Sequence, residues 1–302
     1  MRLLLGVDGG GTGCRAALAT PGGHILGIGK SGSANMMTDI DIARRNIVEA
    51  ARLAFIEAGL DPTDMAATSA FLGLAGANVS ANREILSRTL PFQANRIETD
   101  AIIALYGAIE DHDGTVVILG TGSAFISQYG GTIRIAGGWG FKVSDLGGGA
   151  RIGRDVLEET LLAHDGFHRS SPMTDAAMAQ FAHDPRKIVE FAHSAKPGDF
   201  GRFAPLAFEY ADSGDEVAGA IIARAVRQIE EGLNATMPKD DNLAGRLCLL
   251  GGLAPLYADR LSRQYRDRLQ SPLGDALNGA VKLAVRNFYV GEAANHGQVG
   301  HG

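Results

Sequence analysis

The first half of the chain alternates between short apolar runs and longer segments with apolar residues at helical spacing. The apolar runs are bounded by turn residues and predict strands, at about residues 2–8, 14–20, 24–30, 68–74 and 95–99. The helical spacing predicts helices, at about residues 39–58, 80–89 and 101–109. The N-terminal half is therefore predicted to mix strands and helices.

The second half opens with three more predicted strands within residues 115–140 and is then mostly helical from 149 to 237. A strand at 246–250 and helices at 255–268 and 275–289 complete the prediction. The polar, turn-forming segment 111–114 is the best candidate for a domain boundary. We therefore expect an N-terminal domain over residues 1–112 and a C-terminal domain over residues 113–302.

One strand–glycine–strand pattern occurs twice. The first copy reads LLLGVDGGGTGCRAAL over residues 3–18 and leads into a turn and a third strand. The second copy reads TVVILGTGSAFISQYGGTIRIAGGWG over residues 115–140. Two such units predict duplicated domains that face each other across a cleft, with one glycine loop in each.

The first glycine loop has the composition of a phosphate seat. Gly9, Gly10 and Gly11 permit backbone dihedrals closed to other residues and leave no side chain before an approaching ligand. Consecutive free amides in such a turn form a concavity for an anion. Asp8 can face a cation, directly or through water, and Thr12 adds a hydroxyl. The loop therefore predicts a binding site for a metal-bound polyphosphate. The alternative is an ordinary glycine hairpin, but the second copy of the strand–glycine–strand pattern argues against it.

Two other phosphate-binding motifs fit less well. A dinucleotide fingerprint requires a third glycine and a helix, but Cys14 and a strand pattern follow the first glycine loop. A Walker motif ending at Lys30-Ser31 would need its first glycine at position 24, which is His24.

Composition and charge narrow the class of protein. At 302 residues the chain suits two domains, and its apolar content of 45% with 21% charged residues is ordinary for a globular protein. The net charge of −6 argues against a general binder of nucleic acids or membrane surfaces. No apolar run approaches the ~20 residues of a membrane span, and the two cysteines, Cys14 and Cys248, lie in strand patterns. These features predict a cytoplasmic protein with free buried thiols.

Eight segments, spread in order over nearly the whole chain, resemble the actin-like sugar kinases of the BadF/BadG/BcrA/BcrD type. Within them the chain is similar to the amino-sugar kinases, bacterial glucosamine kinases and eukaryotic-type N-acetylglucosamine kinases. The segments are GVDGGGT (6–12), SGSANMM (31–37), GLAGA (73–77), ETDA (98–101), GTGS (120–123), GGWG with SDLGGGARIG (137–153), LLGGLAP (249–255) and PLGDALNGA (272–280).

The resemblance implies an α/β fold of two RNase H-like (actin-like ATPase) domains around a central cleft. It also implies an ATP- and Mg²⁺-dependent kinase that phosphorylates the 6-hydroxyl of an amino sugar. Asp100 would position and deprotonate that hydroxyl, since phosphoryl transfer needs a nearby proton acceptor. Asp8 would orient hydrated Mg²⁺. The residues expected to bind phosphate or ATP are Gly9, Gly10, Gly11, Thr12, Gly120, Thr121, Gly122, Gly251 and Gly252.

The residues expected to bind sugar are Asn35, Asp100, Gly138, Trp139 and Asp145. The amide of Asn35 offers an acceptor and two donors to vicinal hydroxyls, and Asp145 matches a second sugar-facing carboxylate of the family. Each assignment has a structural alternative. Asp100 could be a helix N-cap, Asn35 a turn residue, Asp145 a surface loop residue, and Gly251-Gly252 an ordinary strand-to-helix turn. Trp139 could cover the sugar or fill the domain interface.

Two competing classes of function remain. The first is an ATPase that activates an acyl-CoA dehydratase, which would need suitably exposed cysteines for a metal cluster. The second is a non-catalytic sugar sensor, a class that usually carries a helix-turn-helix extension. His164 and His168 suggest no metal site, because Gly166 between them breaks the helix and no third ligand is evident.

The expected partners are therefore ATP and a small amino sugar, with no nucleic acid and no membrane. The sequence leaves open the choice between glucosamine and N-acetylglucosamine, and also whether the chain forms a homodimer.

Overall fold

The computed structural model describes residues 2–77, 80–238 and 245–290. Its contacts divide the chain into two compact units, described separately below. The first unit runs to Asp111 and resumes at Pro272, and the second runs from His112 to Ser271. The first boundary lies within the polar segment that the sequence suggested. The C-terminal end differs from the expected division, because the last helix packs on the N-terminal sheet and so belongs to the first unit.

The first unit is built on a five-stranded sheet in the order β3-β2-β1-β4-β5. Strands β1, β2 and β3 are antiparallel, while β4 and β5 run parallel to β1. Their bounds are β1 Leu4–Gly9, β2 Cys14–Ala19, β3 Ile25–Ser31, β4 Ser69–Leu74 and β5 Ala94–Thr99. All five predicted strands are present. Parallel strands end at the same side of a sheet, so the residues after β1, β4 and β5 share that side.

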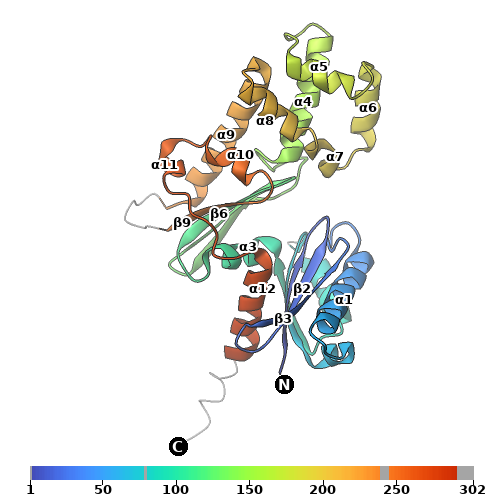
Figure 1. Cartoon of the computed structure of the whole chain (residues 1–302), viewed down its shortest axis with the longest axis vertical. Helices are drawn as coiled ribbons and strands as arrows, with labels where there is room; N and C mark the ends of the chain where they lie inside the picture. The colour runs from blue at the N-terminus through green and yellow to red at the C-terminus, as the bar shows by residue number, and fades with distance from the viewer. Residues whose placement is uncertain (1, 78–79, 239–244, 291–302) are drawn as a thin grey trace, which may run out of the picture. The chain divides into compact units, whose positions relative to one another are not determined.

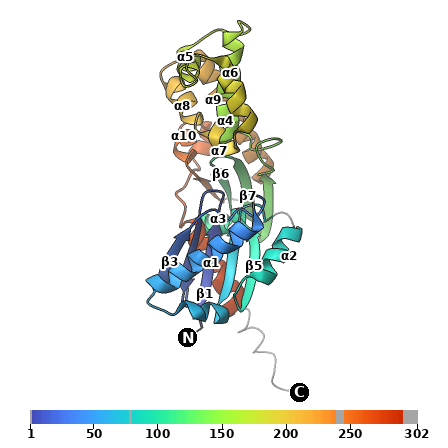
Figure 2. The same ribbon diagram turned by 90° about the vertical axis from the view of Figure 1, so that its right-hand side faces the viewer.

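Helices cover both faces of this sheet (Figures 1 and 2). Alternating residues of β1 separate the two faces: Leu5 and Val7 join the core under α1, whereas Leu4 joins the core under α3 and α12. The bounds are α1 Ile40–Glu57, η1 Pro62–Ala67, α2 Ser80–Thr89, α3 Asp100–Ile109, α12 Ala276–Val285 and a π-helical turn Arg286–Val290. Three layers result, as expected for an α/β domain.

The second unit repeats the first four strands of this sheet in the order β8-β7-β6-β9. Strand β9 runs parallel to β6, as β4 does to β1, and β6, β7 and β8 are antiparallel. Their bounds are β6 Gly114–Leu119, β7 Ser123–Tyr129, β8 Thr132–Gly137 and β9 Arg246–Leu250. The duplication predicted from the two glycine patterns is confirmed in the sheets.

The remaining helices belong to the second unit (Figure 1). Their bounds are α4 Gly149–His164, α5 Pro172–Ala179, α6 Pro185–Ser194, α7 Pro197–Gly201, α8 Ala204–Asp212, α9 Glu216–Thr236, α10 Ala254–Ala258 and α11 Arg263–Arg266. The single helix expected at 255–268 is wrong, since α10 and α11 are separate. The Ser262 amide donates to Glu230 Oε1 at 2.6 Å instead of continuing the helix.

Within the described residues, no helix combines the length and apolar character needed to cross a membrane.

Candidate active site

The first glycine loop leaves the end of β1 and is fixed by its neighbours. The Gly10 amide donates to Gly13 O at 2.8 Å, and the carbonyls of Gly9 and Gly10 accept from Ala75 and Ala34 at 2.8 and 3.0 Å. The expectation of consecutive free amides is therefore wrong at Gly10. The expected dihedral reason is also wrong, because Gly9, Gly10 and Gly11 all lack a positive φ.

The need for glycine in this loop comes from the space around each Cα atom and not from the backbone dihedrals. A Cβ on Gly9 would lie 2.5 Å from a methyl of Leu74, so a side chain does not fit there. A Cβ on Gly11 would meet nothing within 4 Å and would project from the loop. The first glycine thus allows tight packing, and the later ones leave the outer side of the loop bare for a ligand.

Asp8, the residue before this loop, is held by Arg15 on the neighbouring strand. The register places the two opposite each other, and Arg15 Nη2 and Nε donate to Asp8 Oδ2 at 2.7 and 3.3 Å. Arg15 Nη1 also donates to Asp275 Oδ2 at 2.7 Å. Burial opposes the charge of Arg15, but its hydrogen bonds to the two carboxylates raise its pKa above the ordinary value. Only one oxygen of Asp8 remains for a cation.

Asp100 follows β5 and is the first residue of α3. It is half-buried, and its Oδ1 accepts the amide of Ala101 at 3.0 Å. The N-cap position itself falls on Thr99, whose side chain makes no capping bond. Burial raises the pKa of Asp100, the Ala101 amide opposes this, and the nearby charge of Asp8 raises it further. Asp8, at the end of β1, and Asp100, after the parallel strand β5, lie at the same side of the sheet.

Asn35 follows β3 in a turn beside the first loop. Its Oδ1 accepts the Met37 amide at 2.9 Å, so the turn role is present in the structure. This leaves the side-chain NH₂ and the second lone pair of Oδ1 for a ligand, and contact of Asn35 with a sugar stays a prediction.

The second glycine loop also has an internal backbone bond, which spans two residues where that of the first loop spans three. Gly120 N donates to Gly122 O at 2.9 Å, and the loop carbonyls of Gly120 and Thr121 accept from Gly149 and Ala150 at 2.9 and 2.8 Å. Gly149 and Ala150 begin α4, whose first amides need partners outside the helix. The loop is thereby joined to a helix N-terminus, the end that carries partial positive charge.

Asp145 lies against this second loop. It is 8% exposed, has a left-handed φ of 59°, and its Oδ1 accepts the Gly140 amide at 3.2 Å. Burial raises its pKa, while the backbone amides of Gly140 and Ser123 and the charge of Arg151 oppose the shift. The alternative of an exposed loop aspartate is wrong. Contact with a sugar stays a prediction for Asp145.

The GGWG segment after β8 presents its tryptophan to solvent. Trp139 is 71% exposed, so it is not packed in the core of its own unit. Gly138 before it has a φ of +69° and donates its amide to Ser123 O at 3.0 Å. The segment is therefore tied to the second loop through its backbone, with the indole ring accessible.

Gly251 and Gly252 follow β9 in the second unit. Gly251 has a φ of +93°, and a Cβ there would lie 2.3 Å from Leu119 O, so only glycine fits. Leu119 directly precedes the second loop. A Cβ on Gly252 would meet nothing within 4 Å, which leaves that side of the turn bare. Gly251 thus has a structural role, and nucleotide binding stays a prediction for the pair.

The structure adds residues that sequence reasoning missed. Arg15 is a lone charge in the otherwise apolar strand CRAALA, a signal that its partner lies nearby. Asp275 directly precedes α12, and Asn278 is the third residue of that helix. This spacing is the pattern of a capping box, in which each side chain accepts the other residue's amide, and the structure shows it. Gly149, at the start of α4, lies in a motif to which the sequence assigns no role, and in the structure its amide donates to Gly120 O.

A magnesium ion fits the donors of the first unit only in a particular way. In residues 2–77, 80–238 and 245–290 no group of three or more His, Cys, Asp or Glu could enclose a metal. Mg²⁺ keeps several waters and is commonly bound through one or two carboxylates together with substrate phosphates. The open oxygen of Asp8, beside the bare glycine loop, supplies such a carboxylate.

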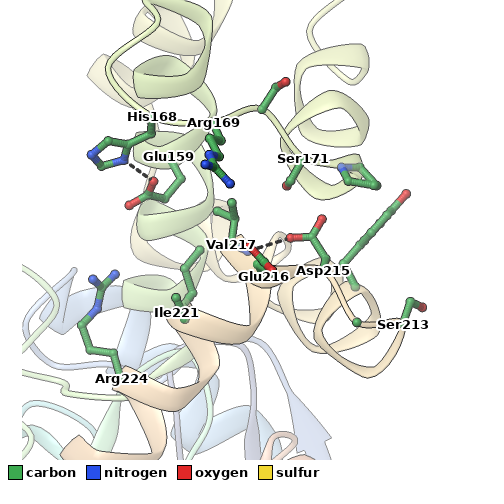
Figure 3. Close-up of a pocket in the computed structure, with 15 residues that line it drawn as sticks. Glu159, His168, Arg169, Ser171, Ser213, Asp215, Glu216, Val217, Ile221 and Arg224 are labelled. Atoms are coloured by element: carbon green, nitrogen blue, oxygen red, sulfur yellow. Dashed lines mark hydrogen bonds and ion pairs between the residues drawn. The ribbon is translucent and has the colours of Figure 1, made fainter.

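The second unit also contains a pocket of about 720 Å³ that involves none of the predicted site residues (Figure 3). Its charged groups are engaged with each other: His168 pairs with Glu159 at 2.7 Å, and Asp215 accepts the amides of Met173, Val217 and Ala218.

Two α/β domains, each with a glycine loop after the first strand of a repeated sheet, define an ATPase of the actin-like fold. The chain belongs to the BadF/BadG/BcrA/BcrD ATPase family, which matches residues 5–279. A glucosamine kinase of Vibrio cholerae serotype O1 is 36% identical over 285 residues, covering 94% of this chain and 96% of that protein. An N-acetyl-D-glucosamine kinase of Dictyostelium discoideum is 26% identical over 257 residues, with 78% and 80% covered.

A solved structure agrees with the sequence comparisons. A Chromobacterium violaceum protein, provisionally named an N-acetylglucosamine kinase, superposes with a TM-score of 0.86 at 33% identity. The match covers 94% of this chain and 99% of that one.

Proposed function

We propose that the protein is an ATP- and Mg²⁺-dependent kinase that phosphorylates the 6-hydroxyl of glucosamine or N-acetylglucosamine. The observation that carries the proposal is that Asp8, at the end of β1, and Asp100, directly after the parallel strand β5, lie at the same side of one sheet. Transfer of a phosphoryl group to a hydroxyl requires a proton acceptor near the bound nucleotide and its metal ion. Asp100 is proposed as the acceptor, Asp8 as the carboxylate that faces the metal, and the glycine loop as the phosphate site. The similarity to the Vibrio cholerae glucosamine kinase over nearly the whole chain supports it.

In this proposal Asp100 accepts the proton of the attacking hydroxyl and orients that hydroxyl toward the γ-phosphoryl group. Burial favours the protonated form of Asp100, and a base whose pKa lies nearer the working pH also returns its proton readily. The bond from the sugar oxygen to phosphorus forms while the bond to the leaving ADP oxygen breaks. Alignment and charge stabilisation supply most of the rate enhancement.

The two glycine loops bind the phosphates in this proposal. Gly10, Gly11 and Thr12 are assigned to the first phosphate site and Gly120 and Thr121 to the second, where a Cβ on Gly11 or Gly120 would meet nothing within 4 Å. The N-terminus of α4 behind the second loop adds favourable electrostatics for a polyphosphate. Asn35, Trp139 and Asp145 are assigned to the sugar, and Gly252 to the nucleoside.

Mg²⁺, when bound with the nucleotide, would neutralise phosphate charge; the residue that would orient it, through water, is Asp8. Asp8 can do this with the oxygen that Arg15 does not occupy.

The dehydratase-activator alternative needs cysteines that can reach a shared metal cluster. Cys14 and Cys248 are 1% and 0% exposed in the cores of their units. Burial raises the pKa of Cys14 to about 12, which opposes the thiolate form that binds metals. The kinase is therefore the favoured function. Buried free thiols also fit the cytoplasmic location that we include in the proposal.

An assay of ADP release over a panel of hexoses and amino sugars tests this function. We expect ADP only when ATP, Mg²⁺ and glucosamine or N-acetylglucosamine are present together. Equal turnover with glucose would contradict the amino-sugar assignment. ADP release without any sugar would contradict the kinase assignment and favour an ATPase.

A further inference from the structure

A single guanidinium joins two carboxylates at the edge of the first glycine loop. Arg15 extends from β2, Asp8 from the neighbouring β1, and Asp275 from the start of α12. The two shorter bonds, one to each aspartate, are 2.7 Å long, a normal length for charge-assisted hydrogen bonds. The side chain of Asp8 is 21% exposed and that of Asp275 is 50% exposed, so the geometry is defined by the pairing of β1 with β2 and by the cap of α12 rather than by burial.

The Asp275 side chain is fixed independently of Arg15. Its Oδ1 accepts the Asn278 amide at 2.9 Å and caps α12, which leaves Oδ2 for the guanidinium. Burial opposes ionisation of Asp275, but the Asn278 amide and Arg15 lower its pKa below the ordinary value. Asp275 is therefore a rigid, charged anchor for Arg15.

The helix that carries this anchor is packed on the helix that begins with Asp100. A Cβ on Gly107 of α3 would lie 2.0 Å from Asp275 O, and one on Gly279 of α12 would lie 2.0 Å from Ile103 O. The two backbones are in direct contact at both points. The anchor of Arg15 and the proposed base Asp100 thus share one rigid pair of helices.

We propose that Arg15 is a positioning residue: with Asp275 as its anchor, it holds the Asp8 carboxylate in the orientation that binding of the Mg²⁺–nucleotide complex requires. This inference rests on the proposed function. The guanidinium engages Asp8 Oδ2 twice, and no group in the described part of the chain donates to Oδ1. One oxygen is thereby restrained and the other is presented beside the bare side of the loop.

Positioning and charge act in opposite directions here, which makes the inference testable. A positive charge at hydrogen-bond distance from Asp8 weakens the attraction of that carboxylate for a cation. Restraint of the carboxylate strengthens binding, because residues that orient metal ligands typically contribute 10- to 100-fold in metal affinity. If positioning dominates, removal of Arg15 weakens Mg²⁺-dependent binding; if charge dominates, removal strengthens it.

The experiment is calorimetric titration of ADP at a series of Mg²⁺ concentrations and in EDTA, without sugar and without turnover. For Arg15→Met we expect the Mg²⁺ concentration for half-maximal enhancement of ADP binding to rise about 10- to 100-fold. Arg15→Lys keeps the charge but not the fork that spans two carboxylates, so a clear rise is expected there too. Asp275→Asn keeps the cap and removes the charged anchor, and should fall between Arg15→Met and the wild type.

Controls separate this inference from the proposed function. Arg96→Met removes another arginine–carboxylate pair of the same sheet, that with Glu98, and should leave the Mg²⁺ dependence unchanged. Glucosamine or N-acetylglucosamine binding should be retained in every variant. If all three variants need no more Mg²⁺ than the wild type for ADP binding, the positioning role of Arg15 is wrong. The proposed kinase function is not affected by that outcome. If ADP binding by the wild-type protein does not depend on Mg²⁺, the role proposed for Asp8 is wrong. If Arg15→Met does not fold, the other two variants decide.

Discussion

The carboxylate of Asp145 lies directly against the backbone of Gly122 in the second glycine loop. A Cβ placed on Gly122 would be 2.4 Å from Asp145 Oδ2, although 23 residues separate the two in the chain. Gly120, two residues earlier in the same loop, would bear a Cβ that meets nothing within 4 Å. The loop thus has one side packed on a buried aspartate and one side bare.

This contrast predicts different effects for two alanine substitutions in one loop. Gly122→Ala should lower the free energy of unfolding by about 1–3 kcal/mol, the usual cost of overpacking. Gly120→Ala should leave stability nearly unchanged and weaken ATP binding, because its methyl group projects where the phosphates would lie. Thermal or denaturant unfolding and ATP titration measure the two effects. Equal destabilisation by both variants would contradict the contact with Asp145.

Replacing the proposed base should reduce catalysis with little change in sugar binding. Asp100→Asn keeps the shape of the side chain and an oxygen for the Ala101 amide, but it cannot accept the proton. We expect kcat to fall by roughly 10²–10⁴, the usual contribution of a general base. Asp64→Asn, at an exposed aspartate in η1, is the matched control and should retain full activity. Near-normal turnover of Asp100→Asn would leave Asp100 only a structural role.

The same variant should be more stable than the wild type at neutral pH. Burial raises the pKa of Asp100 in the folded state, so the folded chain binds its proton more tightly than the unfolded chain. Stability therefore falls as pH rises from the unfolded pKa of ~3.9 through the raised value. Asp100→Asn removes this loss, and its advantage should disappear below about pH 4. Denaturant unfolding at several pH values measures it, and a constant difference across pH would contradict the raised pKa.

Blocking the first glycine loop should separate nucleotide binding from folding. The atom nearest to a Cβ on Gly10 would be Gly13 O, at 3.7 Å, so Gly10→Val can fold. Its branched side chain would occupy the proposed phosphate seat. Calorimetry should show loss of ATP binding with retained binding of glucosamine or N-acetylglucosamine. Gly219→Val, at an open position in α9, is the control, and ATP binding by Gly10→Val would make the loop structural.

Trp139 should contribute to sugar binding and not to stability. Because the ring is 71% exposed, Trp139→Ala should change the free energy of unfolding by less than about 0.5 kcal/mol. Loss of an aromatic contact of ~0.5–1.5 kcal/mol would raise KM for the amino sugar about twofold to tenfold. Val143→Ala, also in the exposed loop, should change neither. A loss of stability without a change in KM would assign Trp139 to packing.

Much of the fold follows from local pattern. The strands β1 to β3 and the helices α1 and α3 lie within a residue or two of their predicted bounds, and the three strands expected within residues 115–140 are β6 to β8. Short apolar runs and the turn residues between them are local signals, so they can be read without knowledge of distant contacts. The repeated glycine pattern likewise predicted the repeated sheets.

Errors occurred where a distant partner decides the structure. The helix expected at 255–268 is interrupted because Glu230, on α9, takes the Ser262 amide. The boundary at the C-terminal end was misplaced because α12 finds its partners, β1 and α3, more than 160 residues earlier in the chain. No pattern within either segment carries that information.

The sequence by itself determined the residue types of the candidate site: an aspartate before a glycine loop, a second glycine loop, and an aspartate after a later strand. Only the tertiary structure decided how they are held. Arg15 meets both Asp8 and Asp275, Asn35 uses its oxygen in a turn, and Asp145 is buried against Gly122. Hydrogen bonds and close packing act over a few ångströms in space, whatever the separation in the chain, and their pairing is settled only when the chain has folded.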